Sequence, residues 1–260
     1  VRKMSVTFKE KSVLPGFGLS LGFTVLYLSL VVLVPLSALV LRSGEQGWAG
    51  FWEAIRQPRV LAAFRVTFRS AFEAALVNVV LGVTVAWFLV RGRFPLKRLV
   101  DALVDLPVAM PTAVSGIALT ALLAPNAALG GALARLGVPG AFTPLGITVA
   151  MVFIGLPFVI RSVQPSLADL SRELEEAAGS LGATRAQTLR RVVLPLLRPP
   201  LVAALVYSFV RSMTTVSAVI FLVSAEYNLA TAYIVGRVEA GEFGLAIAYS
   251  SVLIVFMALG

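Results

Sequence analysis

The sequence predicts an all-α, polytopic membrane protein whose six transmembrane helices form a single domain over residues 1–260. Three observations lead to this fold class. Hydrophobic residues make up 58% of the chain and charged residues 13%, with a mean hydropathy of +0.93, which leaves too little polar surface for a soluble globule of this length. Apolar runs recur that reach the roughly 20 residues a helix needs to cross a bilayer. Lysine and arginine gather in alternate connections between these runs.

The chain contains no cysteine and no histidine. Disulfides, thiolate nucleophiles and cysteine-based metal sites are therefore excluded, and the commonest general base and metal ligand is absent. The net charge of +9 is compatible with nucleic-acid binding, but a surplus of Lys and Arg is also the expected topology signal of a membrane protein. We expect a lipid bilayer, and no nucleic acid, as the partner of this surface.

The six predicted spans cover approximately residues 16–41, 66–90, 99–124, 144–164, 199–223 and 243–260. Four basic residues precede the first run, so a cleaved signal peptide is a competing interpretation of it. The run is too long for that interpretation, and no small-residue cleavage site closes it. The first run is therefore predicted to remain as a span.

The connections between the spans carry the turn signals. Residues 42–65 predict an outer loop with a short surface helix, interrupted at Pro58. Pro107 and Pro111 lie four residues apart and should kink or break the first turns of the third span, because each lacks a backbone donor. Glycines and prolines predict a turn-rich loop over residues 125–143, and a polar loop is expected before the sixth span.

The distribution of basic residues predicts the orientation. With the N-terminus inside the cell, the inner segments are residues 1–15, 91–98 and 161–198, and they hold 14 of the 22 Lys and Arg residues. This asymmetry predicts that both termini are cytoplasmic, although the first outer loop is more basic than the positive-inside rule favours. The long polar segment at residues 165–198 is then a cytoplasmic loop.

That polar segment contains two helical patterns. Apolar residues recur at helical spacing from Leu170 to Leu181, which predicts a short amphipathic helix. Gly182 is where such a helix can stop, because glycine adopts the left-handed conformation without a steric penalty. A second helical run, residues 185–193, leads to the next span. Amphipathicity alone is equally typical of a helix that lies on the membrane interface.

The spacing within the segment is more specific. Glu176, Ala177 and Ala178 are followed by Gly182 and, nine residues further on, by an aliphatic stretch that ends in Leu194 and Pro195. This pattern resembles the cytoplasmic loop in the membrane subunits of binding-protein-dependent ABC importers. The resemblance implies the type I ABC importer permease fold. It also implies that these six residues belong to a coupling loop that docks in a cleft of an ATPase subunit, with Glu176, Ala177, Ala178 and Gly182 as the contact site.

No catalytic constellation or metal site is visible, and the sequence has no Gly-x-x-x-x-Gly-Lys-Ser/Thr phosphate loop. We therefore expect that the chain is not itself an enzyme and that ATP and Mg are bound by partner subunits. The resemblance implies two ATP-binding subunits, a second permease that is homologous or identical, and a periplasmic substrate-binding protein. It also implies the bacterial inner membrane as the location.

Two parts of the chain resemble importers of different substrates. Residues 14–41, 97–107, 111–119 and 155–165 are similar to the T-type permease of sulfate and thiosulfate importers. Residues 227–231 and 236–239 are more similar to permeases of ferric-iron importers. Sulfate or thiosulfate is the first expectation for the substrate, and ferric iron or another oxyanion such as molybdate is the alternative.

Arg211 is the prominent charge within a predicted span. Near the middle of the fifth span it would cost at least about 2.5 kcal/mol, so it is expected to serve an ion path or a buried partner. Thr214, Thr215 and Ser217 follow within two turns and could line the same path. The alternative is structural: Arg211 could clamp neighbouring backbone, and hydroxyl groups commonly bond to their own helix. Small residues at 115, 116 and 120 are expected to serve helix packing.

Two other classes of protein are disfavoured. A secondary carrier needs intramembrane acids for ion coupling, whereas Glu73 and Asp105 lie near the ends of their predicted spans. An intramembrane enzyme without His or Cys is limited to Ser/Lys or carboxylate chemistry, and no predicted span contains a lysine.

Overall fold

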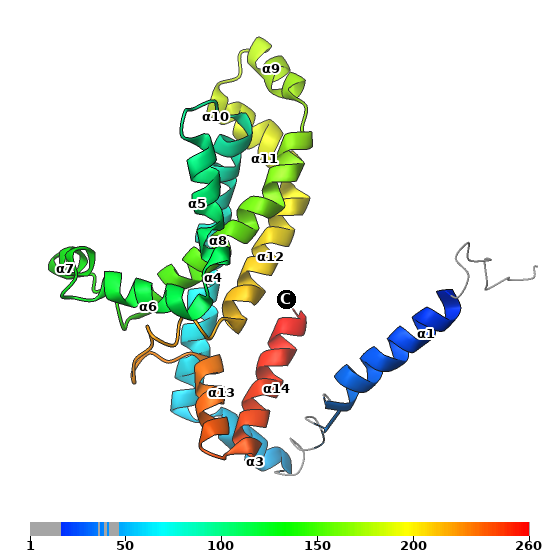
Figure 1. The fold of residues 1–260 in the computed structure, drawn as a ribbon, viewed down its shortest axis with the longest axis vertical. Helices are drawn as coiled ribbons and strands as arrows, with labels where there is room; N and C mark the ends of the chain where they lie inside the picture. Colours follow the sequence, from blue (N-terminus) through cyan, green and yellow to red (C-terminus); the bar gives the residue numbers. More distant parts are fainter. Residues whose placement is uncertain (1–16, 36, 39–40, 42–46, 260) are drawn as a thin grey trace, which may run out of the picture.

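The computed structural model describes residues 17–35, 37–38, 41 and 47–259, and within these residues every regular element is a helix. Three helices pack against one another as a trunk: α4 (Pro58–Arg91), α8 (Pro144–Asp169) and α12 (Arg198–Thr214) (Figure 1). The predicted all-α class is confirmed for the described part of the chain. The trunk has two ends, called here the α9 end and the α13 end after the helices beside them.

The chain enters the described region through an apolar helix. The α-helix α1 (Phe17–Leu28) continues as the π-helix η1 (Ser29–Leu33), and its large side chains are exposed. Figure 1 shows α1 standing apart from the trunk. The basic N-terminal residues and positions 16, 36 and 39–40 of the predicted first span lie outside the described residues.

The interruption predicted at Pro58 is confirmed, because one helix ends at Ile55 and the next begins at Pro58. The short surface helix is present as α3 (Gly47–Ile55), and Pro58 then occupies the first position of the 34-residue helix α4. Proline is well suited to that position, because the first turn has no use for its missing N–H group. The second span therefore extends further toward the N-terminus than the predicted residues 66–90.

The third predicted span is broken into α5 (Lys97–Ala109) and α6 (Thr112–Leu123), which are bent by 109°. Met110, between them, has extended backbone (φ −92°, ψ 143°), as expected for the residue before a proline. The predicted break is thus confirmed, but it falls in the middle of the run, after Pro107 rather than in the first turns. A helix, α7 (Ala128–Arg135), occupies part of the predicted turn-rich loop.

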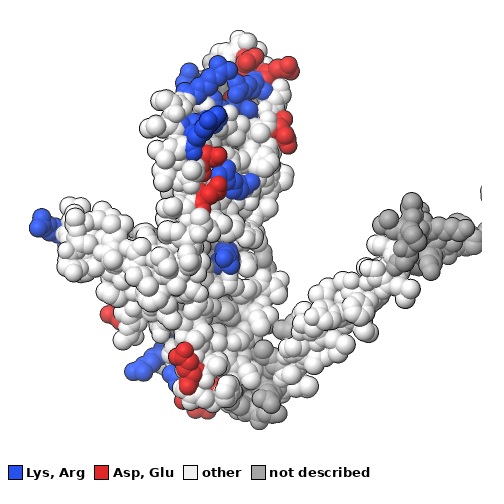
Figure 2. All heavy atoms as spheres, in the orientation of Figure 1, with Lys and Arg blue, Asp and Glu red and all other residues white. Residues whose placement is uncertain are grey.

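The polar connection after α8 folds as α9 (Arg172–Ser180), α10 (Arg185–Thr188), the π-helix η2 (Leu189–Val193) and α11 (Leu194–Leu196). The helical run Arg185–Leu196 meets α12 at an angle of 74°. Both predicted helical patterns of this segment are confirmed. Figure 2 shows that Lys and Arg side chains gather over this end of the trunk.

The fifth predicted span is too long. α12 ends at Thr214, and residues 215–229 form turns and irregular backbone. The chain continues with α13 (Ala230–Glu239), which was expected as loop, and ends with α14 (Phe243–Leu259). Arg211 therefore lies in the last turn of α12, and its predicted position near the middle of a span is wrong.

The six-span count is supported only in part. By length and composition, α4 and α8 can cross a membrane, and each of the two bent pairs adds one span if it is counted as one. The first and sixth predicted spans fall on shorter apolar helices, Phe17–Leu33 and Phe243–Ala258.

Candidate functional site

The helix that carries most of the predicted coupling motif is defined by local signals. At its start the Ser171 hydroxyl accepts a hydrogen bond from the backbone N–H of Glu173 (3.2 Å), which satisfies one of the free donors of the first turn. Glu173 and Glu175 in that turn complement the positive end of the helix dipole. These few residues are sufficient to begin α9 here.

Gly182 ends α9 as the sequence predicts. Its φ of +82° is in the left-handed region. The N–H of Ala183 donates to the carbonyl oxygen of Ala178 (3.0 Å), and the N–H of Gly182 donates to that of Gly179 (2.9 Å). This is the paired bonding of a Schellman motif, which requires a residue that tolerates positive φ. The helical run that follows begins at a capping box between Thr184 and Gln187.

The motif residues lie at one end of the molecule and differ in exposure. Glu176, Ala177 and Gly182 are exposed, Ala178 is half-buried, and Leu194 and Pro195 on α11 are also half-buried. The apolar face of α9 reaches into solvent, since Leu174 is 44% and Leu181 89% exposed. The structure therefore presents the α9 part of the motif as an open, partly apolar surface with a charged rim.

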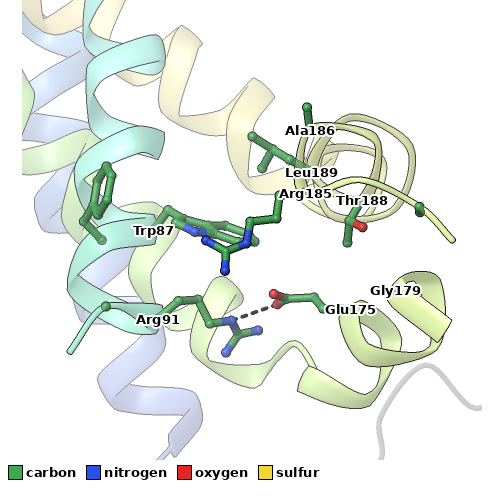
Figure 3. A pocket seen from close by; sticks show the side chains of 11 residues that line it. Trp87, Arg91, Glu175, Gly179, Arg185, Ala186, Thr188 and Leu189 are labelled. Carbon is green, nitrogen blue, oxygen red and sulfur yellow. Dashed lines mark hydrogen bonds and ion pairs between the residues drawn. The ribbon is translucent and has the colours of Figure 1, made fainter.

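An ion pair that was not predicted from the sequence holds α9 to the trunk. Arg91, the last residue of α4, donates from Nε to Oε1 of Glu175 (2.8 Å) (Figure 3). Its Nη2 donates to the carbonyl oxygen of Leu170 (2.7 Å). The two charged side chains are only 11% and 21% exposed. The ion pair joins α9 directly to the C-terminal end of the 34-residue helix α4.

A further ion cluster joins α5 to α8. Arg161 donates to Asp101 (2.8 Å), to Asp105 (2.6 Å) and to Gln164 (2.7 Å). Sequence reasoning treated Asp105 only as a charge near the end of a span. The three-residue ion cluster explains how charged groups are held between α5 and α8, because each is paired.

All four predicted pathway residues line one small cavity toward the α13 end. The cavity has a volume of about 90 Å³ and is lined by Arg211, Thr214, Thr215 and Ser217, together with Thr112, Ile154, Val216 and Ala218. The guanidinium of Arg211 lies 5.7 Å from the ring centre of Phe158, a cation–π distance. Arg211 forms no ion pair with any residue that the structure describes.

The hydroxyl groups beside Arg211 are less available than the sequence suggests. Thr215 donates to the carbonyl oxygen of Arg211 (2.8 Å), and Thr214 donates to the same carbonyl (3.0 Å) and to that of Val210 (3.2 Å). This is the bonding of Ser and Thr to their own helix that was the structural alternative. Of the four predicted pathway residues, Arg211 and Ser217 have side-chain donors that form no hydrogen bond with any residue the structure describes.

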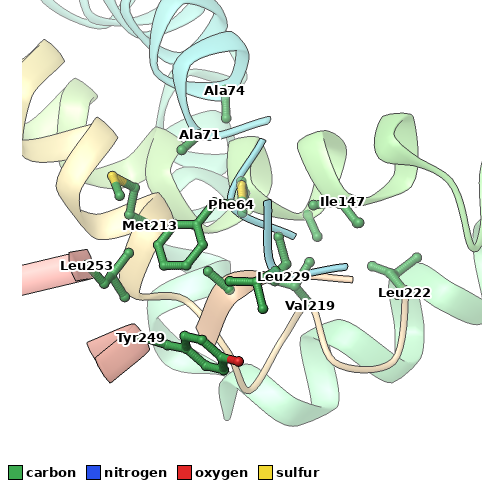
Figure 4. Close-up of a cluster of buried hydrophobic side chains, with 14 of the residues drawn as sticks. Phe64, Ala71, Ala74, Ile147, Met213, Val219, Leu222, Leu229, Tyr249 and Leu253 are labelled. Atoms are coloured by element: carbon green, nitrogen blue, oxygen red, sulfur yellow. The ribbon is translucent and has the colours of Figure 1, made fainter. Parts of the chain in front are cut away.

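Contacts from a distant helix fix the irregular segment after α12. A side chain on Gly116 of α6 would collide with the carbonyl oxygen of Ala218, and Thr120 donates to the carbonyl oxygen of Phe221 (3.2 Å). Val219 and Leu222 are fully buried in the hydrophobic cluster that Figure 4 shows. The expectation that Gly116 and Thr120 serve packing is confirmed.

The chain is similar to proteins of known families. The family model described as "Binding-protein-dependent transport system inner membrane component" matches residues 78–260. The chain is 44% identical over 248 residues to the sulfate transport system permease protein CysT of Salmonella typhimurium (strain LT2), and 46% identical over 248 residues to that of Escherichia coli (strain K12). Each match covers 94% of this chain and 90% of the relative.

Two solved structures share the fold. A crystal structure of a bacterial alginate ABC transporter in complex with an alginate pentasaccharide-bound periplasmic protein contains a chain that matches with a TM-score of 0.76 at 15% identity, covering 93% of this chain and 90% of that one. A second crystal structure, of a bacterial ABC transporter that imports alginate, matches with a TM-score of 0.73 at 15% identity, covering 94% and 92%. Likeness at this identity concerns the fold alone.

Proposed function

We propose that this chain, which belongs to the family of binding-protein-dependent transport system inner membrane components, forms the translocation path of an ATP-driven importer for sulfate or thiosulfate. The observation that carries the proposal is the 44–46% identity to two sulfate transport permeases over 94% of the chain. The matched length includes both the coupling motif and Arg211.

The proposed arrangement follows from the family and from the charges. Two such permeases, identical or homologous, pair in the bacterial inner membrane above two ATP-binding subunits, and a periplasmic binding protein delivers the substrate. The basic α9 end faces the cytoplasm, so both termini are cytoplasmic. The six spans are then α1, α4, the α5–α6 pair, α8, the bent run ending in α12, and α14. ATP and Mg are bound by the partner subunits alone.

Energy is proposed to enter through α9. Closure of the ATPase pair on ATP moves the docked helix, with Glu176, Ala177, Ala178 and Gly182 at the contact and Leu194 and Pro195 supporting it. The Arg91–Glu175 pair passes this movement to α4, and α4 is packed against α8 and α12. A rigid trunk turns a displacement at one end into an opening at the other, which is the hinge type of conformational change. Hydrolysis resets the path.

Arg211 is proposed as the contact for the anion. Its guanidinium offers planar, charge-assisted donors to two oxygens of a sulfate group, and no carboxylate of the described residues neutralises it. Ser217 and the Thr214–Thr215 pair shape the cavity around it. A cation in this position favours an oxyanion over ferric iron, while molybdate, with the same charge and shape class, remains the alternative substrate.

The test is uptake of radiolabelled sulfate by the complete importer in proteoliposomes. Arg211→Gln is expected to reduce uptake about tenfold or more, because one charge-assisted hydrogen-bonding group in a site of low dielectric is lost. Arg211→Lys should retain part of the uptake, since it keeps the charge but not the planar fork. Unlabelled thiosulfate is expected to compete with radiolabelled sulfate for uptake. If molybdate competes and thiosulfate does not, molybdate replaces sulfate and thiosulfate as the proposed substrate.

A further inference from the structure

A cavity of about 610 Å³ lies at the α9 end, between the last turn of α4 and the helices α9 and α10. Figure 3 shows its polar side, where the side chains of Arg91, Glu175 and Arg185 point toward one another. Its apolar side is formed by Trp87 and Phe88 of α4 and by Leu189. The cavity is therefore amphipathic, and its polar part is built from two arginines and one carboxylate.

The charges in this cavity do not balance. Arg91 is paired with Glu175, whereas the guanidinium of Arg185 forms no ion pair or hydrogen bond with any residue the structure describes. The polar side thus carries a net charge of one positive unit. Arg185 also occupies the first position of a helix, where the helix dipole disfavours a cation. Neither local helix structure nor an internal partner accounts for an arginine at this place.

The apolar side of the cavity suits a molecule that lies at a membrane surface. Phe88 is 58% exposed and belongs to a helix that is able to cross a membrane. Trp87 precedes it in the same turn. Aromatic side chains in the last turn of a span are typical of the interface between acyl chains and head groups. A ligand with an anionic head and an apolar tail would cover both sides of the cavity.

We propose that this cavity binds the phosphodiester head group of an anionic lipid from the inner leaflet. Arg185 donates to the phosphate oxygens, with Arg91 beside it, and the apolar part of the lipid lies along Phe88. One phosphodiester carries one negative charge, which matches the unbalanced charge. The bound lipid ties α10 to α4 and thereby steadies the coupling loop. The orientation of the α9 end toward the inner leaflet rests on the proposed function; the sulfate specificity plays no part.

The experiment measures lipid retention by the complete importer, with its ATPase subunits, by native mass spectrometry after titration with phosphatidylglycerol or phosphatidylcholine. We expect the wild type to retain phosphatidylglycerol preferentially. Arg185→Gln should weaken that retention about five- to tenfold, from the loss of one interfacial charge and its hydrogen bonds. Arg190→Gln is the matched control, because Arg190 is exposed in the same helical run but does not line the cavity.

Each other outcome overturns the proposal. Equal losses in Arg185→Gln and Arg190→Gln would mean that only general surface charge attracts the lipid. Retention independent of Arg185, or equal retention of both lipids, would mean that no head-group site exists. If inorganic phosphate binds to the wild type in phosphatidylcholine and depends on Arg185, the site takes free phosphate instead. Arg185→Lys, expected to retain binding, distinguishes loss of the site from misfolding of Arg185→Gln. None of these measurements depends on sulfate transport. A negative result for lipid binding would therefore contradict this proposal without contradicting the proposed function.

Discussion

The two ends of the trunk differ in what determines their structure. At the α9 end, the helix boundaries follow from residues within a few positions of each boundary: Ser171 caps the start of α9, Gly182 ends it, and Thr184 begins the next run. At the α13 end, α12 stops at Thr214 within an apolar run that continues to residue 223. The local sequence therefore specifies the proposed coupling loop, whereas contacts between distant segments specify the proposed path.

The largest effect is expected at the local end, from Gly182→Asp. Aspartate, like asparagine, tolerates the left-handed region better than most non-glycine residues, so the main change is a negative charge at the negative end of the α9 dipole, on the proposed docking surface. Sulfate uptake by the reconstituted importer should fall more than about tenfold, with ATPase activity no longer stimulated by the loaded binding protein.

Gly182→Asn is the matched control, because asparagine tolerates the left-handed conformation and adds no charge. It should retain most of the uptake. Normal sulfate uptake by Gly182→Asp would contradict the assignment of this loop as the coupling site. Equal losses of uptake in both variants would show that the effect comes from misfolding of the loop.

The Arg91–Glu175 pair is expected to have the next largest effect. Arg91→Gln leaves a little-exposed carboxylate without its partner, at a cost of about 1–3 kcal/mol, and frees α9 from α4. Uptake should fall several-fold, while the isolated ATPase subunits are unaffected. Combining Arg91→Glu with Glu175→Arg should restore part of the loss, and a double-mutant cycle measures the coupling energy. Additive losses would show that the pair does not connect the loop to the trunk.

Features that depend on neighbouring residues could be predicted from the sequence, and contacts between distant residues could not. Helix caps and a glycine with positive φ depend on residues close together in the sequence, so the two helices of the proposed coupling loop and their boundary at Gly182 were predicted. The Arg91–Glu175 pair joins residues 84 positions apart, and the Arg161–Asp105 contact joins residues 56 positions apart. Hydropathy and residue spacing describe short stretches of the chain, so neither could predict these two ion pairs.

The errors on the fifth span and on the start of the second span have different causes. Uniform hydropathy over residues 199–223 predicts one span, but Val219 and Leu222 are buried in the core and Phe221 accepts a bond from Thr120, 101 positions away. Tertiary contacts therefore override the helical pattern. The second span was predicted to begin at residue 66 rather than at Pro58, because a proline that interrupts one helix is equally compatible with the first turn of the next.

Gly116→Ala tests the distant contact and should have the smallest effect of the three. The added methyl group must displace the backbone at Ala218, which we expect to cost about 1–3 kcal/mol, as for other overpacked sites. Thermal unfolding of the purified complex should shift downward by a few degrees. Gly236→Ala is the control, because a side chain there meets no other atom within 4 Å. An unchanged midpoint for Gly116→Ala would show that α6 does not fix the irregular segment.

The central claim is that this permease couples ATP hydrolysis to delivery of sulfate, and the most direct measurement is ATPase turnover of the reconstituted complex. Turnover is compared in the presence of sulfate-loaded and ferric-loaded binding proteins from the same source. Stimulation by the sulfate-loaded protein alone is the predicted result. Stimulation by the iron-loaded protein alone would contradict it, and would mean that the C-terminal part of the chain decides the substrate and that Arg211 is not a sulfate contact.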